Sequence, residues 1–241
     1  MKKVVHLAKD RGYANFGWLQ ARYSFSFGNY YNPKKVHFGA LRVLNDDIIL
    51  GGTGFATHPH DNMEIVTIPL EGGLAHEDST GQSGIIRKND VQIMSAGTGI
   101  YHSEKNAFAD RITKHLQIWV FPKVRNIPPR YAQKSYPPES YQNRLQVVVA
   151  PDRPDEALWI NQDAYFWLGN FEKDQKVTYQ IQKQGNGVYA FLIEGQAEIA
   201  GETLHARDAV GVWETDNLKI KFSENSHLLL IEVPMNLNSY R

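Results

Sequence analysis

Two short segments of the 241-residue chain carry metal-binding side chains spaced two positions apart. The first contains His58-Pro59-His60, and the second contains His102-Ser103-Glu104. Alternate residues of a β-strand point to the same face, so each segment would project its two polar side chains together. Two such strands facing each other inside a barrel would bring three imidazoles and one carboxylate to one point. The spacing therefore predicts a metal site.

The two motifs support a metal site jointly, because each alone has a simpler explanation. A lone His-Pro-His segment is equally well explained as a turn that carries histidines, and Pro59 cannot donate to a central ladder. Glu64 follows His60 by four residues and shares its parity along a strand, so periodicity leaves it open as a further ligand. His115 begins another alternating segment. We interpret it as structural, with a hydrogen bond that supports the ligands as the alternative.

The expected donor set of three nitrogens and one oxygen leaves open positions on a six-coordinate metal ion. Such a set suits Fe(II), with Mn, Ni, Cu, Co or Zn as substitutes. Structural zinc prefers a closed tetrahedral set that often includes Cys, and the chain has none. The apolar residues near the motifs have core packing as their default role, but an apolar mouth is typical of ligand sites. We therefore expect Phe55, Met63 and Met94 to contact a substrate.

The elements that must position these side chains are predicted to be short strands separated by turns rich in Gly, Asn and Asp. The predicted strands are 39–44, 48–50, 63–68, 91–94 and 116–120. Residues 45–47, Asn-Asp-Asp, are expected to form a turn between the first two. The aromatic-rich segment 23–31 is interpreted as a strand that covers the core, with an aromatic lid as the alternative. No window longer than about ten residues shows helical periodicity, so the fold is predicted to be all-β and antiparallel.

A cluster of five prolines between residues 121 and 138 separates two halves with a similar strand pattern. Because Pro cannot serve a central ladder, we place a domain boundary there and expect domains at 1–135 and 136–241. Two pairs of segments echo each other across the boundary: 65–72 with 189–195, and 86–92 with 204–210. These echoes indicate an internal duplication. The second copy has no His-x-His segment, so only the first domain is expected to bind a metal.

The composition is that of an ordinary globular protein and excludes several classes of function. The 26 basic and 26 acidic side chains give a formal net charge of +0, so no excess of Lys and Arg is available for direct binding of nucleic acid. The absence of Cys excludes disulfides and thiol nucleophiles. No apolar run approaches the roughly 20 residues that a membrane span requires, and the N-terminus has no secretory core. We expect a cytoplasmic protein.

At these motifs the chain resembles the cupin superfamily, and more narrowly the pirin family, close to the bacterial pirins with quercetinase activity. The resemblance is specific over the first half and rests on strand and Gly pattern in the second. The matching segments include Gly17-Trp18-Leu19, Asn29-Tyr30-Tyr31, Phe38-Gly39-Ala40-Leu41-Arg42-Val43, Asn45-Asp46-Asp47, His58-Pro59-His60, Ser95-Ala96-Gly97-Thr98-Gly99-Ile100 and His102-Ser103-Glu104. Asp61-Asn62 departs from the family pattern beside the pocket and leaves the ligands intact.

The resemblance implies a bicupin, a protein of two antiparallel β-barrels, with a single metal ion in the N-terminal barrel. Carried over by position, it implies that His58, His60, His102 and Glu104 are the ligands and that Glu64 is not. It further implies cleavage of a flavonol such as quercetin by O2, with Glu104 as the base that removes the 3-hydroxyl proton. The alternative is a metal-dependent, redox-sensitive regulatory protein that binds a transcription factor or a metabolic enzyme without turning over flavonols in the cell.

Overall fold

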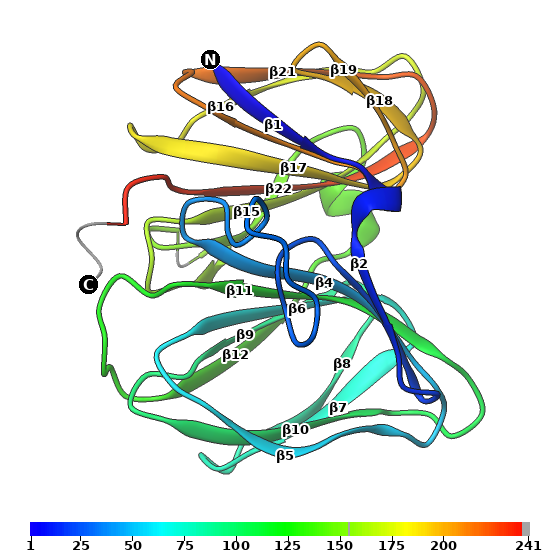
Figure 1. Cartoon of the computed structure of the whole chain (residues 1–241), viewed down its shortest axis with the longest axis vertical. Coiled ribbons are helices and arrows are strands. Elements are labelled where there is room, and N and C mark those ends of the chain that lie inside the picture. Colours follow the sequence, from blue (N-terminus) through cyan, green and yellow to red (C-terminus); the bar gives the residue numbers. More distant parts are fainter. Residues whose placement is uncertain (154, 238–241) are drawn as a thin grey trace.

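Four stacked layers of β-sheet make up the computed structural model of the chain, which describes residues 1–153 and 155–237 (Figure 1). Each outer layer is a four-stranded sheet that faces a seven-stranded sheet, and each such pair forms one barrel. The two seven-stranded sheets lie in the middle of the molecule, against each other. The predicted all-β fold of two barrels is confirmed.

The first barrel contains a seven-stranded sheet and the four-stranded sheet that carries both metal-binding motifs. The large sheet has the order β12 (Arg130–Ser135), β9 (Asp90–Ser95), β6 (Glu64–Glu71), β11 (Thr113–Val120), β4 (Leu41–Ile49), β3 (Leu19–Tyr23) and β2 (Gly12–Asn15). The small sheet has the order β5 (Gly54–His60), β10 (Ile100–Asn106), β7 (Gly73–Asp78) and β8 (Ser83–Arg87).

The second barrel follows the same plan. Its large sheet has the order β1 (Lys2–His6), β20 (Ala209–Trp213), β17 (Asn186–Glu194), β22 (Ser226–Pro234), β15 (Tyr165–Phe171), β13 (Gln146–Ala150) and β14 (Leu158–Trp159). Its small sheet has the order β16 (Lys176–Gln180), β21 (Asn217–Phe222), β18 (Gln196–Ile199) and β19 (Glu202–His205). Over the described ranges the helices are two 3-10 turns, Ala8–Asp10 and Pro138–Tyr141, and none is long and apolar enough to cross a bilayer.

The predicted domain boundary near residue 135 falls just after β12, and it stays a prediction. Part of the proline-rich segment is not a linker, because β12 pairs antiparallel with β9 and completes the large sheet of the first barrel. The strand that occupies the matching place in the second barrel is β1, which pairs with β20. The first strand of the chain therefore belongs to the second barrel.

The repeated sequence segments occupy equivalent places in the two barrels. β6 and β17 are each third in their large sheets, and both end at a glycine with left-handed backbone, Gly72 at φ 75° and Gly195 at φ 87°. Asp90 and Asp208 each accept a hydrogen bond from the backbone amide three residues before them, at 2.8 and 3.0 Å. The same turn chemistry thus recurs in both units, which supports the predicted duplication.

The two barrel interiors differ in polarity. A cluster of fully buried apolar residues fills the second barrel, among them Val188, Leu192, Val210, Leu228 and Leu230. The interior of the first barrel instead contains buried polar side chains, including Asn45, Asp47, Thr67, Gln117 and Glu104. Because an unpaired buried polar group is costly, this difference indicates that the first barrel encloses a functional site and that the second is packed for stability.

The predicted turn at residues 45–47 is wrong. Asn45, Asp46 and Asp47 lie in the middle of β4, which runs without interruption from Leu41 to Ile49. Asp46 forms ion pairs with arginines on the outside of the barrel, and the other two face its interior. The strand interpretation of residues 23–31 is also wrong beyond Tyr23, where β3 ends, and the rest forms turns.

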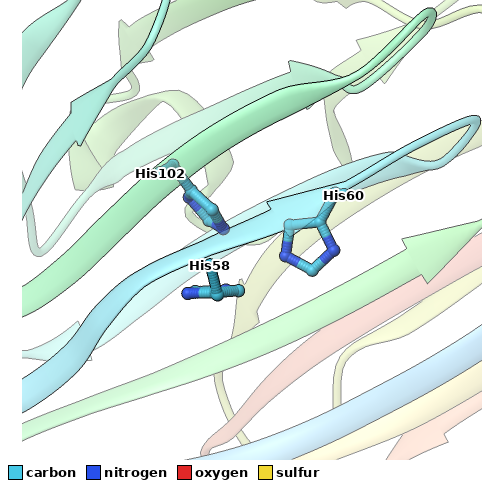
Figure 2. Close-up of side chains that lie close together, drawn as sticks. All are labelled: His58, His60 and His102. Carbon is cyan, nitrogen blue, oxygen red and sulfur yellow. The ribbon is translucent and has the colours of Figure 1, made fainter.

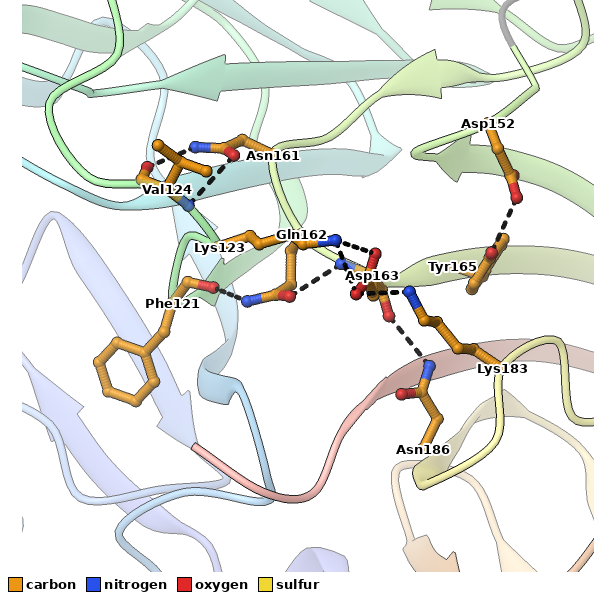
Figure 3. A network of polar contacts seen from close by, with 10 residues as sticks. All are labelled: Phe121, Lys123, Val124, Asp152, Asn161, Gln162, Asp163, Tyr165, Lys183 and Asn186. Atoms are coloured by element: carbon orange, nitrogen blue, oxygen red, sulfur yellow. Dashed lines mark hydrogen bonds and ion pairs between the residues drawn. The ribbon is translucent and has the colours of Figure 1, made fainter. Parts of the chain in front are cut away.

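Polar contacts at the junction of the barrels hold the segment after β11 against the loop before β15 (Figure 3). The Asn161 side-chain amide donates a 2.7 Å hydrogen bond to the carbonyl oxygen of Val124. Asp163 accepts contacts from the ammonium groups of Lys123 and Lys183, at 2.8 and 2.7 Å. Both lysines are about half exposed, so these ion pairs add little stability individually. The hydrogen bond from the buried Asn161 amide is the more specific tie between the two halves.

We expect Gly195→Ala to destabilise the protein more than Gly201→Ala. Both glycines have left-handed backbone, at φ 87° and 76°, so each substitution costs about 1–2 kcal/mol of strain. A Cβ on Gly195 would also lie 2.3 Å from the carbonyl oxygen of Asn225, whereas a Cβ on Gly201 would meet nothing within 4 Å. Urea unfolding should show an additional loss of about 2 kcal/mol for Gly195→Ala. Equal losses for the two variants would contradict the close approach.

Candidate metal centre

Three imidazoles converge inside the first barrel, carried by β5 and its neighbour β10 (Figure 2). His58 lies directly opposite His102 in the antiparallel register, and the centroids of these two rings are 4.4 Å apart. The ring of His60 lies 4.9 Å from each of the other two. One nitrogen from each ring lies within 4.8 Å of the other two nitrogens. The structure thus brings together the histidines of both sequence motifs.

The donor atoms of this group fit a metal ion. The Nδ1 atom of His58 lies 2.8 Å from the carbonyl oxygen of Ala56, which can only accept, so Nδ1 is the donor and Nε2 keeps its lone pair. Both ring nitrogens of His102 are buried and have no hydrogen-bond partner in the part of the chain that the structure describes. Native proteins leave few buried polar atoms unsatisfied, and a metal ion would satisfy these.

Burial keeps two of these imidazoles in the form that binds metals. Desolvation, followed by repulsion from neighbouring histidines, lowers the pKa of His102 to about 3 and the pKa of His60 to about 4. Both rings are therefore neutral near pH 7, with a lone pair available.

Glu104 lies two positions after His102 on β10 and is 3% exposed. One of its carboxyl oxygens accepts a 2.8 Å hydrogen bond from the amide of Gln117, whose own oxygen accepts one from Thr67 at 3.0 Å. Burial raises the pKa of Glu104 to about 7, against the effect of these hydrogen bonds. Its carboxylate lies within 4.8 Å of ring nitrogens of His102 and His76 rather than of all three converging imidazoles. Its role as a ligand stays a prediction.

A second polar pair, His76 and Asp78, lies beside the centre on β7. The register places His76 opposite Glu104 and Asp78 opposite His102. The Nε2 atom of His76 lies 3.0 Å from Asp78 Oδ2, and both side chains are fully buried. Carboxylate–histidine pairs commonly orient the groups around metal sites. The sequence analysis did not include this pair among the candidate site residues. The signal was available, because His76-x-Asp78 has the same period-two spacing as the other motifs.

A cavity of about 330 Å³ opens beside His58, His60 and Glu104. This volume lies within the range of small-molecule sites, about 300–1,000 Å³. Its lining includes five aromatic side chains: Phe16, Tyr23, Phe27, Phe55 and Trp119. Trp119 connects the wall to the centre, because its ring packs edge-on against His60 at 4.9 Å. A flat, apolar ligand would therefore lie next to the metal-binding side chains.

Of the three residues expected to contact a substrate, only Phe55 lies in the wall of this cavity. The structure does not bring Met63 and Met94 to it. Met94 is fully buried and pairs with Ile65 across β9 and β6, and Met63 packs against the same apolar cluster. Closeness in sequence to the two motifs therefore does not predict which apolar side chains line the cavity. These methionines lie near a separate group of apolar side chains, and the aromatic residues named above form the wall instead.

Glu64, which periodicity left open as a ligand, and His115, which was interpreted as structural, both lie outside the group of converging imidazoles. Glu64 accepts hydrogen bonds from the Ser95 hydroxyl at 2.9 Å and from the Asn161 backbone amide at 3.0 Å. It therefore joins β6 to the second half of the chain. His115 is fully buried near Asp47, and neither of its ring nitrogens has a hydrogen-bond partner among the described residues.

A larger hollow, of about 1,060 Å³, lies on the second barrel and is lined by residues such as Gln184, Trp213 and Glu214. It contains no group of metal-ligating side chains. Both groups found over residues 1–153 and 155–237 lie in the first barrel. Size alone does not identify the site, and the chemistry favours the smaller cavity.

Two duplicated β-barrels with an inward-facing cluster of His and Glu in one of them define a bicupin. The pirin family profile matches residues 4–120, and the profile of the quercetinase C-terminal cupin domain matches residues 147–233. The chain belongs to the pirin family.

Individual relatives agree with this assignment over nearly the whole chain. The quercetin 2,3-dioxygenase of Escherichia coli K12 is 39% identical over 227 residues, which cover 94% of this chain and 96% of that protein. A pirin-like protein of Caulobacter vibrioides is 36% identical over 92% of this chain and 95% of that protein. The structure of the E. coli bacterial pirin YhhW in complex with nickel(II) matches with a TM-score of 0.92 at 37% identity, covering 98% of this chain and 100% of that one.

We expect Glu64 to make stability depend on pH. Burial raises its pKa from 4.5 to about 7 in the folded protein, so folding favours the protonated form. Its contribution to stability is complete below pH 4.5 and is lost as the pH rises through 7, by up to about 3 kcal/mol. Glu64→Gln keeps an acceptor without this loss. The stability difference between Glu64→Gln and the natural protein should therefore grow between pH 5 and 8.

The matched control is Glu71→Gln, at the exposed end of the same strand. Urea unfolding at several pH values measures both variants. A pH-independent difference for Glu64→Gln, or one equal to that of the control, would show that the buried carboxyl is not the titrating group.

Proposed function

We propose that this protein is a metal-dependent dioxygenase that cleaves a flavonol such as quercetin with O2. The observation that carries the proposal is the junction of the His and Glu cluster with an aromatic-walled cavity inside one barrel. The relative of E. coli named quercetin 2,3-dioxygenase supports the reaction and the substrate class. Flavonols are flat and aromatic, so their rings suit the aromatic walls. Their adjacent oxygen atoms suit a metal ion held by the His and Glu cluster.

The proposed ligands of a single divalent metal ion are His58, His60, His102 and Glu104. Three nitrogens and one oxygen suit Fe(II), our first choice, with Mn, Ni, Cu, Co or Zn as substitutes. A nickel(II) complex of a structurally similar bacterial pirin supports binding of a divalent ion in this barrel type. When bound, the ion supplies coordination of the substrate oxygens and activation of O2.

The residues of the chain supply positioning, exclusion of water and proton transfer. The aromatic walls hold the flat rings, and burial of the substrate between Phe27, Phe55 and Trp119 displaces water from the centre. We assign to Glu104 the role of the base that accepts the proton of the flavonol 3-hydroxyl on a carboxyl oxygen. The side-chain amide of Gln117 donates a hydrogen bond to the Glu104 carboxyl group and so holds it in a fixed orientation.

We expect His102→Ala to lower the affinity for nickel(II) by at least about 100-fold. The substitution removes the imidazole that β10 contributes to the centre. Loss of a ligand costs more than loss of a supporting hydrogen bond, which is worth about 10- to 100-fold. Isothermal titration calorimetry measures the affinity. The control is His205→Ala, an exposed histidine of the second barrel, which should leave it unchanged. Unaltered binding by His102→Ala would reject this ligand set.

We expect Glu104→Gln to lower flavonol turnover by about 100- to 10,000-fold while the three histidines retain part of the metal. The amide is nearly the same size but cannot accept the proton. The assay follows loss of quercetin under oxygen at matched metal content, with the surface variant Glu71→Gln as the control. Undiminished turnover by Glu104→Gln would remove Glu104 from this role. Metal-loaded natural protein that consumes no flavonol would instead favour the regulatory function.

A further inference from the structure

A cluster of cationic side chains surrounds a hollow of about 260 Å³ on the outer face of the first barrel's large sheet. Arg22 of β3 and Lys114 of β11 line it from the first barrel, and Arg207, from the turn between β19 and β20, lines it from the second. Asp46 is the one carboxylate among the described residues of the lining. We call this hollow, lined by Arg22, Lys114, Arg207 and Asp46, the basic cleft.

The basic cleft and the metal centre lie on opposite faces of β4. Side chains alternate along a strand, so Asp46 faces outward while its neighbours Asn45 and Asp47 line the aromatic cavity inside the barrel. In the same way Arg22 is exposed between two buried positions of β3. The cleft is therefore a separate site, and its chemistry does not depend on the metal ion.

The carboxylate of Asp46 is already shared by two guanidinium groups. Its Oδ2 atom lies 2.8 Å from Nε of Arg207 and 3.3 Å from Nη1 of Arg11. The side chain of Arg11 is only 3% exposed, so its charge has little contact with water and depends on this carboxylate. One negative charge therefore serves two positive charges, and Asp46 is not available to neutralise a third.

Arg22 has no carboxylate partner in the part of the chain that the structure describes. The register places it directly opposite Asp46 on the neighbouring strand, a position in which opposite charges commonly pair, yet no ion pair joins the two. Its guanidinium group lies instead over the ring of Tyr13, 3.9 Å from the centroid. Stacking covers one face of the planar group and leaves the N–H donors along its edge free.

The charges around the cleft do not balance. Lys114 pairs with Glu71 at 2.7 Å, but both side chains are at least one-third exposed, so water screens this pair. Together with the three arginines described above, Lys114 makes four cationic groups, and Asp46 and Glu71 make two anionic ones. Two positive charges are in excess. Because the whole chain has a formal net charge of +0, this excess is a local feature.

The backbone of Arg207 shows that this arginine is held in place at a cost. Its φ of 71° is in the left-handed region, which arginine rarely adopts. The equivalent turn of the first barrel has Asn89 at φ 73°, a residue type that favours this region. Strained residues persist where their surroundings fix them, and they cluster at functional sites. Hydrogen bonds to Asp46 and to the carbonyl oxygen of Ile193 fix the guanidinium group of Arg207.

We propose that the basic cleft binds a small oxyanion, the phosphate or carboxylate group of a small molecule, through Arg22 and Arg207. Guanidinium groups donate paired N–H bonds that match the oxygens of both anions, and these charge-assisted bonds are strong. The volume of the cleft suits one such group with a few further atoms. Such a ligand would contact both barrels and would neutralise the excess positive charge at their junction. This inference goes beyond the proposed dioxygenase function.

Titration of the nickel-loaded protein with inorganic phosphate and with malonate tests the basic cleft. Isothermal titration calorimetry at pH 7.5, with sodium chloride at equal ionic strength as the reference, should show saturable binding of at least one of them. The stronger of the two identifies the ligand group as phosphate or carboxylate. Arg22→Gln should lower this affinity by about tenfold or more, because it removes a charged donor. Arg22→Lys keeps the charge without the planar fork and should retain part of the affinity.

The matched control is Lys219→Gln, which removes one positive charge from an exposed position of β21 and should leave the affinity unchanged. Nickel content and melting temperature establish that each variant is loaded and folded. The visible absorption of the bound nickel ion should stay constant during the titration, because an anion that coordinates the metal would change it. Binding of neither anion beyond the chloride reference, or equal losses in Arg22→Gln and Lys219→Gln, would overturn the inference. Binding that changes the nickel spectrum and is unaffected by Arg22→Gln would also overturn it.

Discussion

The antiparallel register of β10 with its two neighbours is the constraint on which the centre depends. It places His102 between His58 of β5 and Asp78 of β7, and Glu104 beside His76. Because side chains alternate along a strand, a slip of β10 by one residue would turn His102 and Glu104 toward the outer face. The backbone pairing of β10 with β5 and β7 therefore specifies which side chains meet at the centre. A β-bulge between His102 and Glu104 adjusts the pairing with β5 at this point.

The same barrel plan is used for two opposite purposes in this chain. The second barrel is filled by aliphatic and aromatic side chains, and the two large sheets share a further apolar cluster that includes Leu44, Ile118, Phe191 and Ile231. These two clusters supply the hydrophobic stabilisation that the polar interior of the first barrel lacks. Duplication thus allows one copy to keep buried imidazoles, carboxyls and an open cavity, which a single isolated barrel would hold at greater cost to its stability.

Much of the fold and the placement of the histidines could be predicted from the sequence, because both depend on a spacing of two residues that is visible locally. The inward-facing positions of β4 at Asn45 and Asp47 could not be predicted. A run such as Asn45-Asp46-Asp47 is typical of a turn, and its alternation acquires meaning only once β4 is known to continue through it. The membership of Met94 in a separate apolar cluster depends on its pairing with Ile65, and the importance of His76 depends on its place opposite Glu104. Each of these facts is a contact between distant segments, which sequence spacing does not show.

The place of β1 in the second barrel has a consequence for how the chain folds during its synthesis. His6 pairs with Ala209, so the edge of that sheet remains incomplete until roughly 200 further residues have been synthesised. At a synthesis rate of about 5–20 residues per second, this interval lasts about 10–40 s. All the strands of the first barrel, including β12, are available well before then. The metal-binding barrel can therefore assemble first, with the leading strand of the chain left unpaired to wait for its partner.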